Sequence, residues 1–346
     1  MEWNFPYYDA GNTSYNPTAM IEHQPVQQWC VDVPSLKSPP IVRDGMLILT
    51  NTSSPTHDGA SLAGYSCSTG ELVWHHTYGE LSTPVTIDES LAFIADGGLQ
   101  MIEPTSGTVL GRQTLENGAK NVTTDDEYLF ISGETVQCFD LDTGEEVWTL
   151  NRTLHDETSF RELMAVGNEA LYIGHGESVT AVEKTTGERL WCQDSGGMIT
   201  TPTVDENQAY ITGFGGTIYT VDAITGEVKW TFDTRTWIEG SVAVDEDHVY
   251  FGGTNNYIVA LTRESGEVVW ASELDSDADT SPVVTSKTVV ISTLEGWVYG
   301  IDRKTGEEQW RFKAEREPYS PAVVDNDVYV INSRAVYRLH CTSEGQ

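Results

Sequence analysis

Basic residues are scarce in this 346-residue chain, which has 19 Lys and Arg against 53 Asp and Glu and a formal net charge of −34. Proteins that bind nucleic acid or anionic lipid normally gather Lys and Arg on one surface, so we expect neither kind of partner. Aromatic residues make up 10% of the chain, enough for a core, which argues against disorder. Acid spread over a folded chain is typical of proteins soluble in high salt, and we interpret the source as halophilic.

Cysteine is also sparse: five residues, an odd number, with no CxxC spacing, so neither a zinc site nor a disulfide framework is indicated. No run approaches 18 apolar residues, and the first residues lack the basic start and apolar run of a signal peptide. We therefore expect no direct membrane insertion. Two locations stay open, the cytoplasm or the cell exterior after removal of a leader.

A short motif, exemplified by "DLDTGEEVW" at 140–148, recurs along the chain. Its copies are separated by 37, 37, 43, 39, 40 and 40 residues and align on seven glycines: Gly70, Gly107, Gly144, Gly187, Gly226, Gly266 and Gly306. Such a period indicates repeated supersecondary units. In the turn, Asp can bond the backbone and Gly can adopt a positive φ.

Period-two alternation surrounds each turn, as in "TIYTVD" before Gly226 and "VKWTF" after it, which predicts a β-hairpin. Two further short strands precede each hairpin. Four strands in about forty residues are typical of a propeller blade. After Trp310 only three strands remain, and an isolated strand surrounds Trp29, so these complete one blade together. The sequence predicts an all-β, eight-bladed β-propeller of four-stranded antiparallel blades, closed by the N-terminal strand, with no exposed edge there.

We divide the chain into a lead-in at 1–24, a single propeller domain at 25–341 and a tail at 342–346.

Seven tryptophans share one position of the repeat, where the second repeat has Gly111 instead. We expect them to wedge between blades: Trp29, Trp74, Trp148, Trp191, Trp230, Trp270 and Trp310.

The pattern of a strand, "TG", three residues and Trp resembles the tryptophan-docking motif of PQQ-type propeller repeats. That family includes quinoprotein alcohol dehydrogenases and outer-membrane assembly lipoproteins of the BamB type. The resemblance covers Trp29 to Leu339, and "YDAGNTSYNP" near the start resembles the lead-in of archaeal members, which implies a haloarchaeal source. It also implies export, so we expect an extracellular or cell-surface protein that reaches its location through a leader or a lipid anchor.

The quinoprotein members bind pyrroloquinoline quinone and calcium at the mouth of the ring, and several have a disulfide between adjacent cysteines there. This chain has no adjacent cysteines and lacks their long insertions. Other catalytic motifs are missing as well: there is no GxSxG, P-loop or HExxH. We therefore expect no enzyme and no cofactor, with a quinone- and calcium-dependent dehydrogenase as the alternative.

Aligning the inner strands on "SPAV" places two residues of each blade at the mouth of the channel. Scarce cations and aromatic anchors gather at these positions and on the loops before them, and we select nine residues for partner or ligand binding: Lys37, Lys120, Arg161, Glu162, Arg235, Trp237, Glu239, Arg316 and Tyr319. A structural role for them, plugging the channel and balancing nearby acid, is the competing interpretation.

A weaker candidate is "DSDAD", where Asp275, Asp277 and Asp279 could offer oxygen ligands to calcium. The segment lacks the glycine and distal glutamate of a full calcium loop, so we favour a solvated acidic loop over a calcium site. We expect a monomeric, non-enzymatic scaffold that binds a protein or surface glycan at the mouth. A small-solute binding protein is the remaining alternative.

Overall fold

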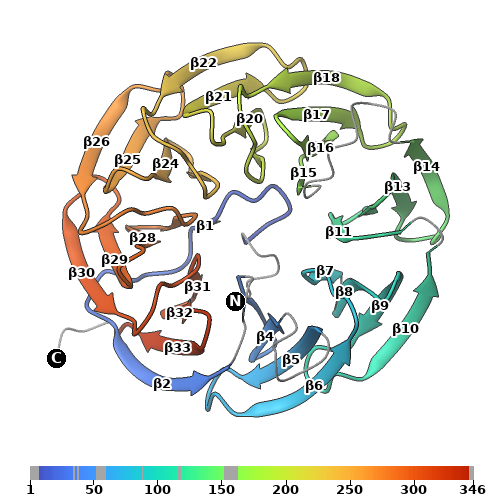
Figure 1. Ribbon diagram of the computed structural model, residues 1–346, viewed down its shortest axis with the longest axis horizontal. Helices are drawn as coiled ribbons and strands as arrows, with labels where there is room; N and C mark the ends of the chain where they lie inside the picture. Colours follow the sequence, from blue (N-terminus) through green and yellow to red (C-terminus); the bar gives the residue numbers. More distant parts are fainter. Residues whose placement is uncertain are drawn as a thin grey trace.

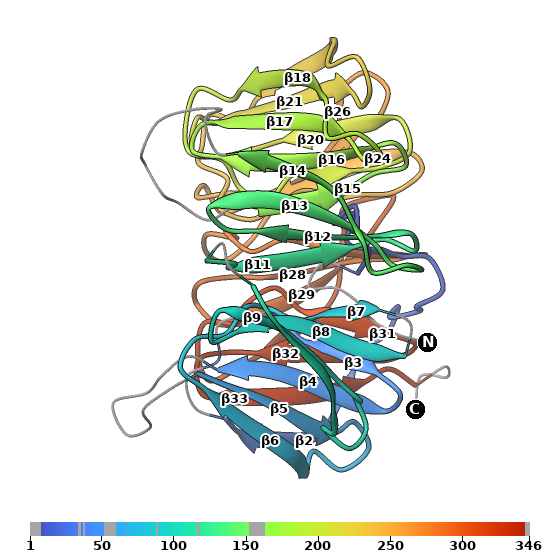
Figure 2. The same cartoon turned by 90° about the vertical axis from the view of Figure 1, so that its right-hand side faces the viewer.

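Eight β-sheets stand radially around a central axis in the computed structural model (Figure 1). The structure describes residues 8–33, 36, 39–51, 60–87, 89–115, 118–151 and 163–342. Seen from the side, the ring is a thick disc with the strands of each blade stacked across it (Figure 2). Within these ranges every regular element is a strand, and no helix is long and apolar enough to cross a membrane. The predicted all-β, eight-bladed propeller is confirmed.

Each blade runs from an inner strand at the channel to an outer strand at the rim, with antiparallel neighbours. The first four blades comprise β3 (Ile41–Arg43), β4 (Met46–Asn51), β5 (Ala60–Ser66) and β6 (Leu72–Tyr78); β7 (Val85–Ile87), β8 (Ser90–Ala95), β9 (Gly98–Ile102) and β10 (Val109–Thr114); β11 (Asn121–Thr124), β12 (Tyr128–Ser132), β13 (Thr135–Asp140) and β14 (Glu146–Asn151); and β15 (Leu163–Val166), β16 (Ala170–His175), β17 (Ser178–Glu183) and β18 (Arg189–Asp194).

Blades 5 to 7 have the same order, and blade 8 takes its outer strand from the N-terminal region. They comprise β19 (Thr203–Val204), β20 (Gln208–Ile211), β21 (Thr217–Asp222) and β22 (Val228–Asp233); β23 (Ala243–Val244), β24 (His248–Gly252), β25 (Tyr257–Thr262) and β26 (Val268–Glu273); β27 (Val283–Thr285), β28 (Thr288–Ser292), β29 (Trp297–Asp302) and β30 (Glu308–Lys313); and β31 (Ala322–Val324), β32 (Asp327–Ile331), β33 (Ala335–His340) and β2 (Val26–Asp32).

The ring closes through the pairing of β2 with β33, in which Cys30 lies opposite Tyr337. This is the closure that the sequence predicts, and it joins the two ends of the propeller in one sheet (Figure 1). Without β2, the hydrogen-bonding edge of β33 would face solvent.

The lead-in is an integral part of the ring, although its sequence does not predict this role. Its strand β1 (Tyr15–Asn16) adds to blade 7 in parallel to β27, giving that sheet a fifth strand. The buried amide of Asn12 donates to the carbonyls of Met164 (3.0 Å) and Pro202 (3.2 Å). These contacts connect the first described residues to blades 4 and 5.

A β-bulge precedes the repeated tryptophan in each hairpin, for example where the register shifts between Ala181 and Val182 opposite Trp191. A bulge turns the following side chain, and here the indole meets the next blade. Each indole N–H donates to a backbone carbonyl: Trp29 to Cys67, Trp74 to Pro104, Trp148 to Lys184, Trp191 to Ala223, Trp230 to Arg263, Trp270 to Arg303 and Trp310 to Ile21. The first six acceptors lie three residues before the turn glycine of the following blade, whereas Ile21 belongs to the lead-in.

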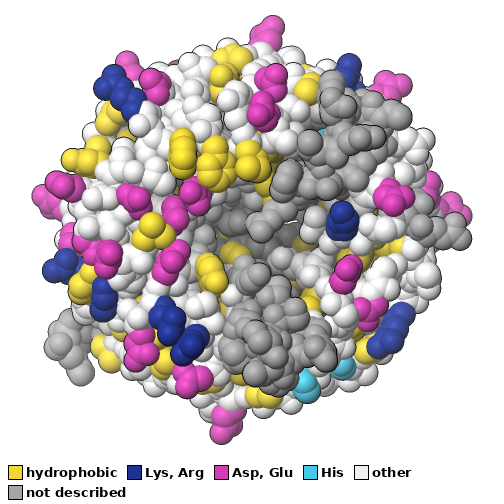
Figure 3. Space-filling view, in the orientation of Figure 1, with side chains coloured by type: hydrophobic (Ala, Val, Ile, Leu, Met, Phe, Trp, Pro, Cys, Tyr) yellow, Lys and Arg dark blue, Asp and Glu magenta, His cyan; other side chains and the backbone are white. Residues whose placement is uncertain are grey.

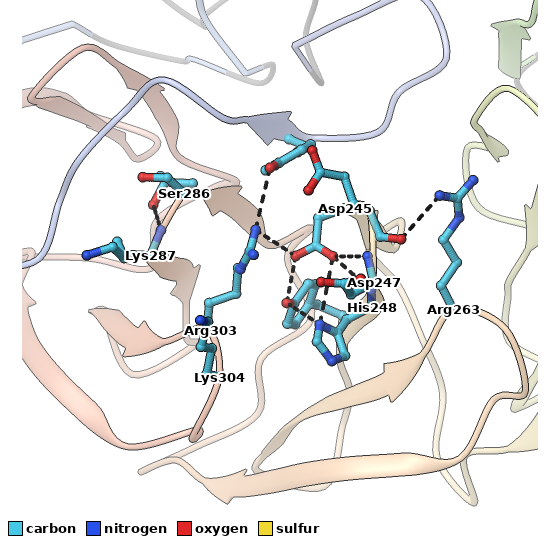
Figure 4. Close-up of polar contacts among 12 residues, drawn as sticks. Asp245, Asp247, His248, Arg263, Ser286, Lys287, Arg303 and Lys304 are labelled. Carbon is cyan, nitrogen blue, oxygen red and sulfur yellow. Dashed lines mark hydrogen bonds and ion pairs between the residues drawn. The ribbon is translucent and has the colours of Figure 1, made fainter.

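Buried ion pairs join some of the same blades. Figure 4 shows Arg303 of blade 7 pointing to Asp245 of blade 6, with 3.2 Å between Nη1 and Oδ2. The Asp245 carboxylate, whose side chain is fully buried, also accepts hydrogen bonds from the backbone N–H of His248 (2.8 Å) and the Tyr250 hydroxyl (2.8 Å). Because a buried charge is tolerated when it is paired and hydrogen-bonded, this network can stay inside the fold. The network around Asp245 therefore has a structural role.

Candidate partner-binding site at the channel mouth

The two ends of the channel are built differently. At the end where the inner strands finish, the lead-in accepts backbone hydrogen bonds from successive blades, such as Val166 N–H to Ala10 O (2.8 Å) and Val204 N–H to Gly11 O (2.7 Å). The opposite end, where the inner strands begin, carries the residues selected from the sequence. We call this end the mouth, and Figure 3 looks onto it.

Direct contacts between inner strands hold the mouth in place. The Ser241 N–H donates to Ser281 Oγ (2.8 Å), and the Ser281 N–H donates to Ser320 Oγ (3.0 Å), which links blades 6, 7 and 8. A Cβ at Gly240 would lie 2.5 Å from the Thr280 carbonyl carbon, so only glycine fits there. The mouth residues of these blades therefore stand on a rigid frame, which favours precise recognition.

An apolar shelf lies on the mouth over blades 5 and 6. Trp237, on the loop between β22 and β23, is 57% exposed, and its ring lies 6.1 Å from that of Phe214 between centroids. Met198, 46% exposed, accepts the Phe214 N–H through its carbonyl (2.9 Å). Figure 3 shows hydrophobic side chains gathered beside the central hollow in this region. We define the apolar shelf as Met198, Phe214 and Trp237.

Acidic side chains adjoin the shelf over blades 6 and 7 (Figure 3). Burial and, after it, the negative charges of Glu239, Glu317 and Asp277 together raise the pKa of Asp279 to about 6. A carboxyl whose pKa is raised by neighbouring carboxylates reports a negative local potential. The mouth is thus electronegative on this side. We define the acidic arc as Glu239, Asp277, Asp279 and Glu317.

The other selected residues fall into three groups. Lys120, Arg235 and Arg316 are exposed, with Arg235 at a turn of positive φ (56°). Tyr319 is half-buried, and its backbone N–H donates to Ile331 O (2.7 Å). The remaining three lie outside the described residues: Lys37, Arg161 and Glu162. The structure therefore places Trp237, Glu239 and Tyr319 on the frame of one face, together with exposed cations.

The three aspartates considered for calcium have different surroundings. Asp275 accepts a hydrogen bond from the Thr293 hydroxyl (3.1 Å), and the Asp277 carbonyl accepts the Leu294 N–H (3.0 Å). Asp279 belongs to the acidic arc. Within the ranges that the structure describes, no three Asp, Glu, His or Cys side chains come together as a metal site. Calcium binding by these residues stays a prediction.

Sequence reasoning missed two parts of this site. Phe214 lies in the glycine-rich segment "GFGGT", which carries no binding motif, and Met198 has no signal beyond its hydrophobicity. Glu317 follows Arg316 directly, and a single acidic residue carries little signal in a chain with 53 Asp and Glu. The contact between the exposed Trp237 and the partly buried Phe214 becomes visible only when the loops of blades 5 and 6 are placed side by side.

Comparison with known protein families identifies the family of this chain. The family model for outer membrane protein assembly factor BamB matches residues 132–237 and 216–340, which together exceed half of the chain. The protein is therefore a PQQ-type repeat propeller. It belongs to the family described by that model. Among curated proteins, none matches the sequence.

Solved structures show the same architecture in proteins of different activity. BamB from Moraxella catarrhalis has a TM-score of 0.71 at 18% identity, over 92% of this chain and 100% of that one. Quinohemoprotein alcohol dehydrogenase ADHIIG from Pseudomonas putida HK5 has a TM-score of 0.72 at 12% identity, over 100% and 81%. The computationally designed protein Ika8 has a TM-score of 0.71 at 16% identity, over 94% and 100%. At these identities the likeness establishes the fold alone.

Proposed function

We propose that this protein is a non-enzymatic scaffold that captures a protein partner at the mouth of its propeller, through the apolar shelf and the acidic arc. The single observation that carries the proposal is the exposed Trp237, whose ring lies tilted beside that of Phe214 on the framed end of the ring. Exposure of a large aromatic side chain to water is unfavourable, and such residues are enriched at binding hot spots. Membership of the BamB family, whose description is an assembly factor, agrees with a protein partner.

The charge of the mouth indicates the chemistry of that partner. Burial and the neighbouring carboxylates of the acidic arc hold the pKa of Asp279 at about 6, so an approaching Lys or Arg would relieve the repulsion between these carboxylates. A partner segment that carries an apolar residue next to basic residues fits both features. A surface glycan could stack on Trp237 but would gain nothing from the acidic arc, so we favour a protein and retain the glycan as an outcome of the test. We further propose that the scaffold acts as a monomer at the surface of a high-salt organism.

The alternative, a quinone dehydrogenase, fits the described residues less well. Pyrroloquinoline quinone carries carboxylates, and Asp279, Glu239 and Glu317 would repel them. The mouth has three exposed cations, Lys120, Arg235 and Arg316, which would attract the carboxylates of the quinone. These side chains offer no oxygen ligands to calcium. We derive no reaction from this arrangement.

The test compares partner capture by three variants at high salt. We expect Trp237→Ala and the double variant E239Q/E317Q to lose a defined partner from surface extract, and Arg316→Ala to weaken its capture. Val228→Ala, an equally exposed apolar position on the outer strand of blade 5 (50% exposed), should retain it. Because all five positions are exposed, melting temperatures should stay unchanged.

Two results would overturn the proposal. One is saturable, stoichiometric heat on calorimetric titration with pyrroloquinoline quinone and calcium, which would favour the dehydrogenase. The other is capture that Trp237→Ala and Val228→Ala reduce equally. Capture that glycosidase treatment of the extract abolishes would identify a glycan in place of a protein.

A further inference from the structure

Blade 2 lacks the tryptophan that the outer strands of all other blades carry. Its equivalent position is Gly111 on β10, where a Cβ would meet nothing within 4 Å. Across the hairpin Gly111 pairs with Met101. In six other hairpins the tryptophan lies opposite a small residue: Gly64, Cys138, Ala181, Thr220, Ala260 and Gly300. The Met101 side chain thus occupies part of the space that an indole fills elsewhere.

The turn of blade 3 that would receive this tryptophan is nevertheless built like the others. Gly144 has a φ of 69°, and its N–H donates to Asp140 O (2.8 Å), as in the equivalent turns. A Cβ at Gly107 or Gly187 would lie 2.6 or 2.8 Å from the preceding tryptophan ring, whereas one at Gly144 would meet nothing within 4 Å. Gly144 is exposed, while Gly107 and Gly187 are buried.

A cavity of about 230 Å³ lies between the two blades at this place. Its apolar walls include Leu99 and Met101 of blade 2 and Leu129, Ile131 and Phe139 of blade 3, and Asp140, Leu141 and Gly144 form its edge. An apolar cavity of about 150 Å³ in another protein binds benzene, so this one has room for a two-ring aromatic. We call it the blade 2–3 groove.

The groove also offers an acceptor in the position used elsewhere. Leu141 lies three residues before Gly144, which is the position of the carbonyls that accept the indole N–H in the other blades, including Pro104 (2.8 Å) and Lys184 (2.6 Å). Asp140, at the edge, has its pKa lowered by hydrogen bonds from the Thr143 N–H and hydroxyl, so it is ionised at neutral pH. Asp142, Glu145 and Glu146 on the same hairpin are exposed.

We propose that the blade 2–3 groove is a receptor site for the tryptophan side chain of a partner protein, supplied in trans where the other blades supply it from their own outer strands. The occupant is an extended segment in which Lys or Arg flanks the tryptophan, because the groove is apolar inside and acidic around its edge. Its indole ring fills the cavity, and its N–H donates to Leu141 O. This site lies between the sheets of blades 2 and 3 and is independent of the mouth.

The experiment uses a capped pentapeptide with one tryptophan between two lysines, and the same peptide with alanine in place of tryptophan. Each is titrated into the full-length protein at high salt, with the methyl signals of Leu129 and Ile131 followed by NMR. We expect the tryptophan peptide to shift these methyls saturably, and the alanine peptide to bind at least about tenfold more weakly. Absence of saturable shifts, or equal binding of both peptides, would overturn the proposal.

Variants of the protein provide the second arm. The double variant G111W/M101A rebuilds the arrangement of the other blades, so its own indole should fill the groove and raise the melting temperature. Binding of the tryptophan peptide to this variant should be at least about tenfold weaker. Gly111→Ala, which leaves the groove open, and Trp237→Ala, which alters only the mouth, should bind the peptide like the wild type. Undiminished binding to a folded G111W/M101A protein would contradict the proposed site whatever the outcome at the mouth.

Discussion

Trp148 and Lys184 join blades 3 and 4: the indole N–H donates to the Lys184 carbonyl across 2.6 Å. The Lys184 ammonium lies 2.6 Å from Asp125 Oδ2, which also belongs to blade 3. One residue of blade 4 is therefore held twice by its neighbour, once through its backbone and once through its side chain. Two later junctions repeat this clamp, with Arg263 held by Trp230 and Asp205 and Arg303 held by Trp270 and Asp245.

Replacing Trp148 with alanine should therefore be severe. The ring is buried, and truncation of a buried aromatic costs about 3–5 kcal/mol of unfolding free energy; the orphaned Lys184 carbonyl adds to this. Urea unfolding at fixed salt measures the loss. Val147→Ala is the control, because this neighbour is 41% exposed, and it should change the stability by less than about 0.5 kcal/mol. Equal losses in both variants would show that the indole does not hold the blades together.

The sequence predicted the ring and its closure because the repeat spacing and the residues left over at the two ends determine both. It could not predict the path of the lead-in. Asn12 bonds carbonyls 152 and 190 residues away, and nothing in "YDAGNTSYNP" indicates such partners. Likewise, the sequence showed that Gly111 interrupts the tryptophan series, but the blade 2–3 groove depends on how far Met101 fills the vacated space, which is a matter of packing.

At the mouth, register alone placed Trp237 and Glu239 on one face. Residue type favoured them over the equivalents in other blades, but the sequence could not show how exposed they are, because exposure depends on loops from neighbouring blades. Phe214 supports Trp237 from a different repeat, and the pKa of Asp279 rises through burial and through charges from blades 6, 7 and 8. Such inter-blade effects have no signature in a single repeat.

Deletion of residues 1–33 tests the closure. This removes β2 along with the lead-in, leaving β33 as an unpaired edge and Trp310 without its acceptor at Ile21. We expect the protein to unfold or aggregate. Deletion of residues 1–24 keeps β2 and is the matched comparison, which should lower the melting temperature but leave a folded ring. A melting temperature unchanged by the longer deletion, at the same salt, would refute this topology.

Salt should stabilise the fold strongly. With a net charge of −34, repulsion between surface carboxylates is weakly screened at 0.01 M salt, where the Debye length is about 30 Å, and strongly screened at 1 M, where it is about 3 Å. The melting temperature should rise steeply between these limits in sodium or potassium chloride. Equal rises with both salts would point to screening of charge. A melting curve that does not respond to salt would contradict the halophilic interpretation.

Asp279 should give the mouth a pH signature of definite sign. Its pKa is about 6 in the folded protein, against an ordinary value of 3.8, so between these values the folded state binds the proton more tightly than the unfolded state. Stability contributed by this group therefore rises as the pH falls through 6 towards 4. Asp279→Asn should be more stable than the wild type at pH 7, and this advantage should shrink at pH 4.5.

The comparison between wild type and variant removes the contribution of all other carboxyls. Asp142→Asn, an exposed position outside the mouth, is the control and should follow the wild type at both pH values. Glu239→Gln removes one of the charges that raise the pKa of Asp279, so NMR titration should find that pKa lower in this variant. If Asp279→Asn and wild type respond to pH with equal slopes, the Asp279 carboxyl does not carry the raised pKa, and the acidic arc would have no electrostatic basis.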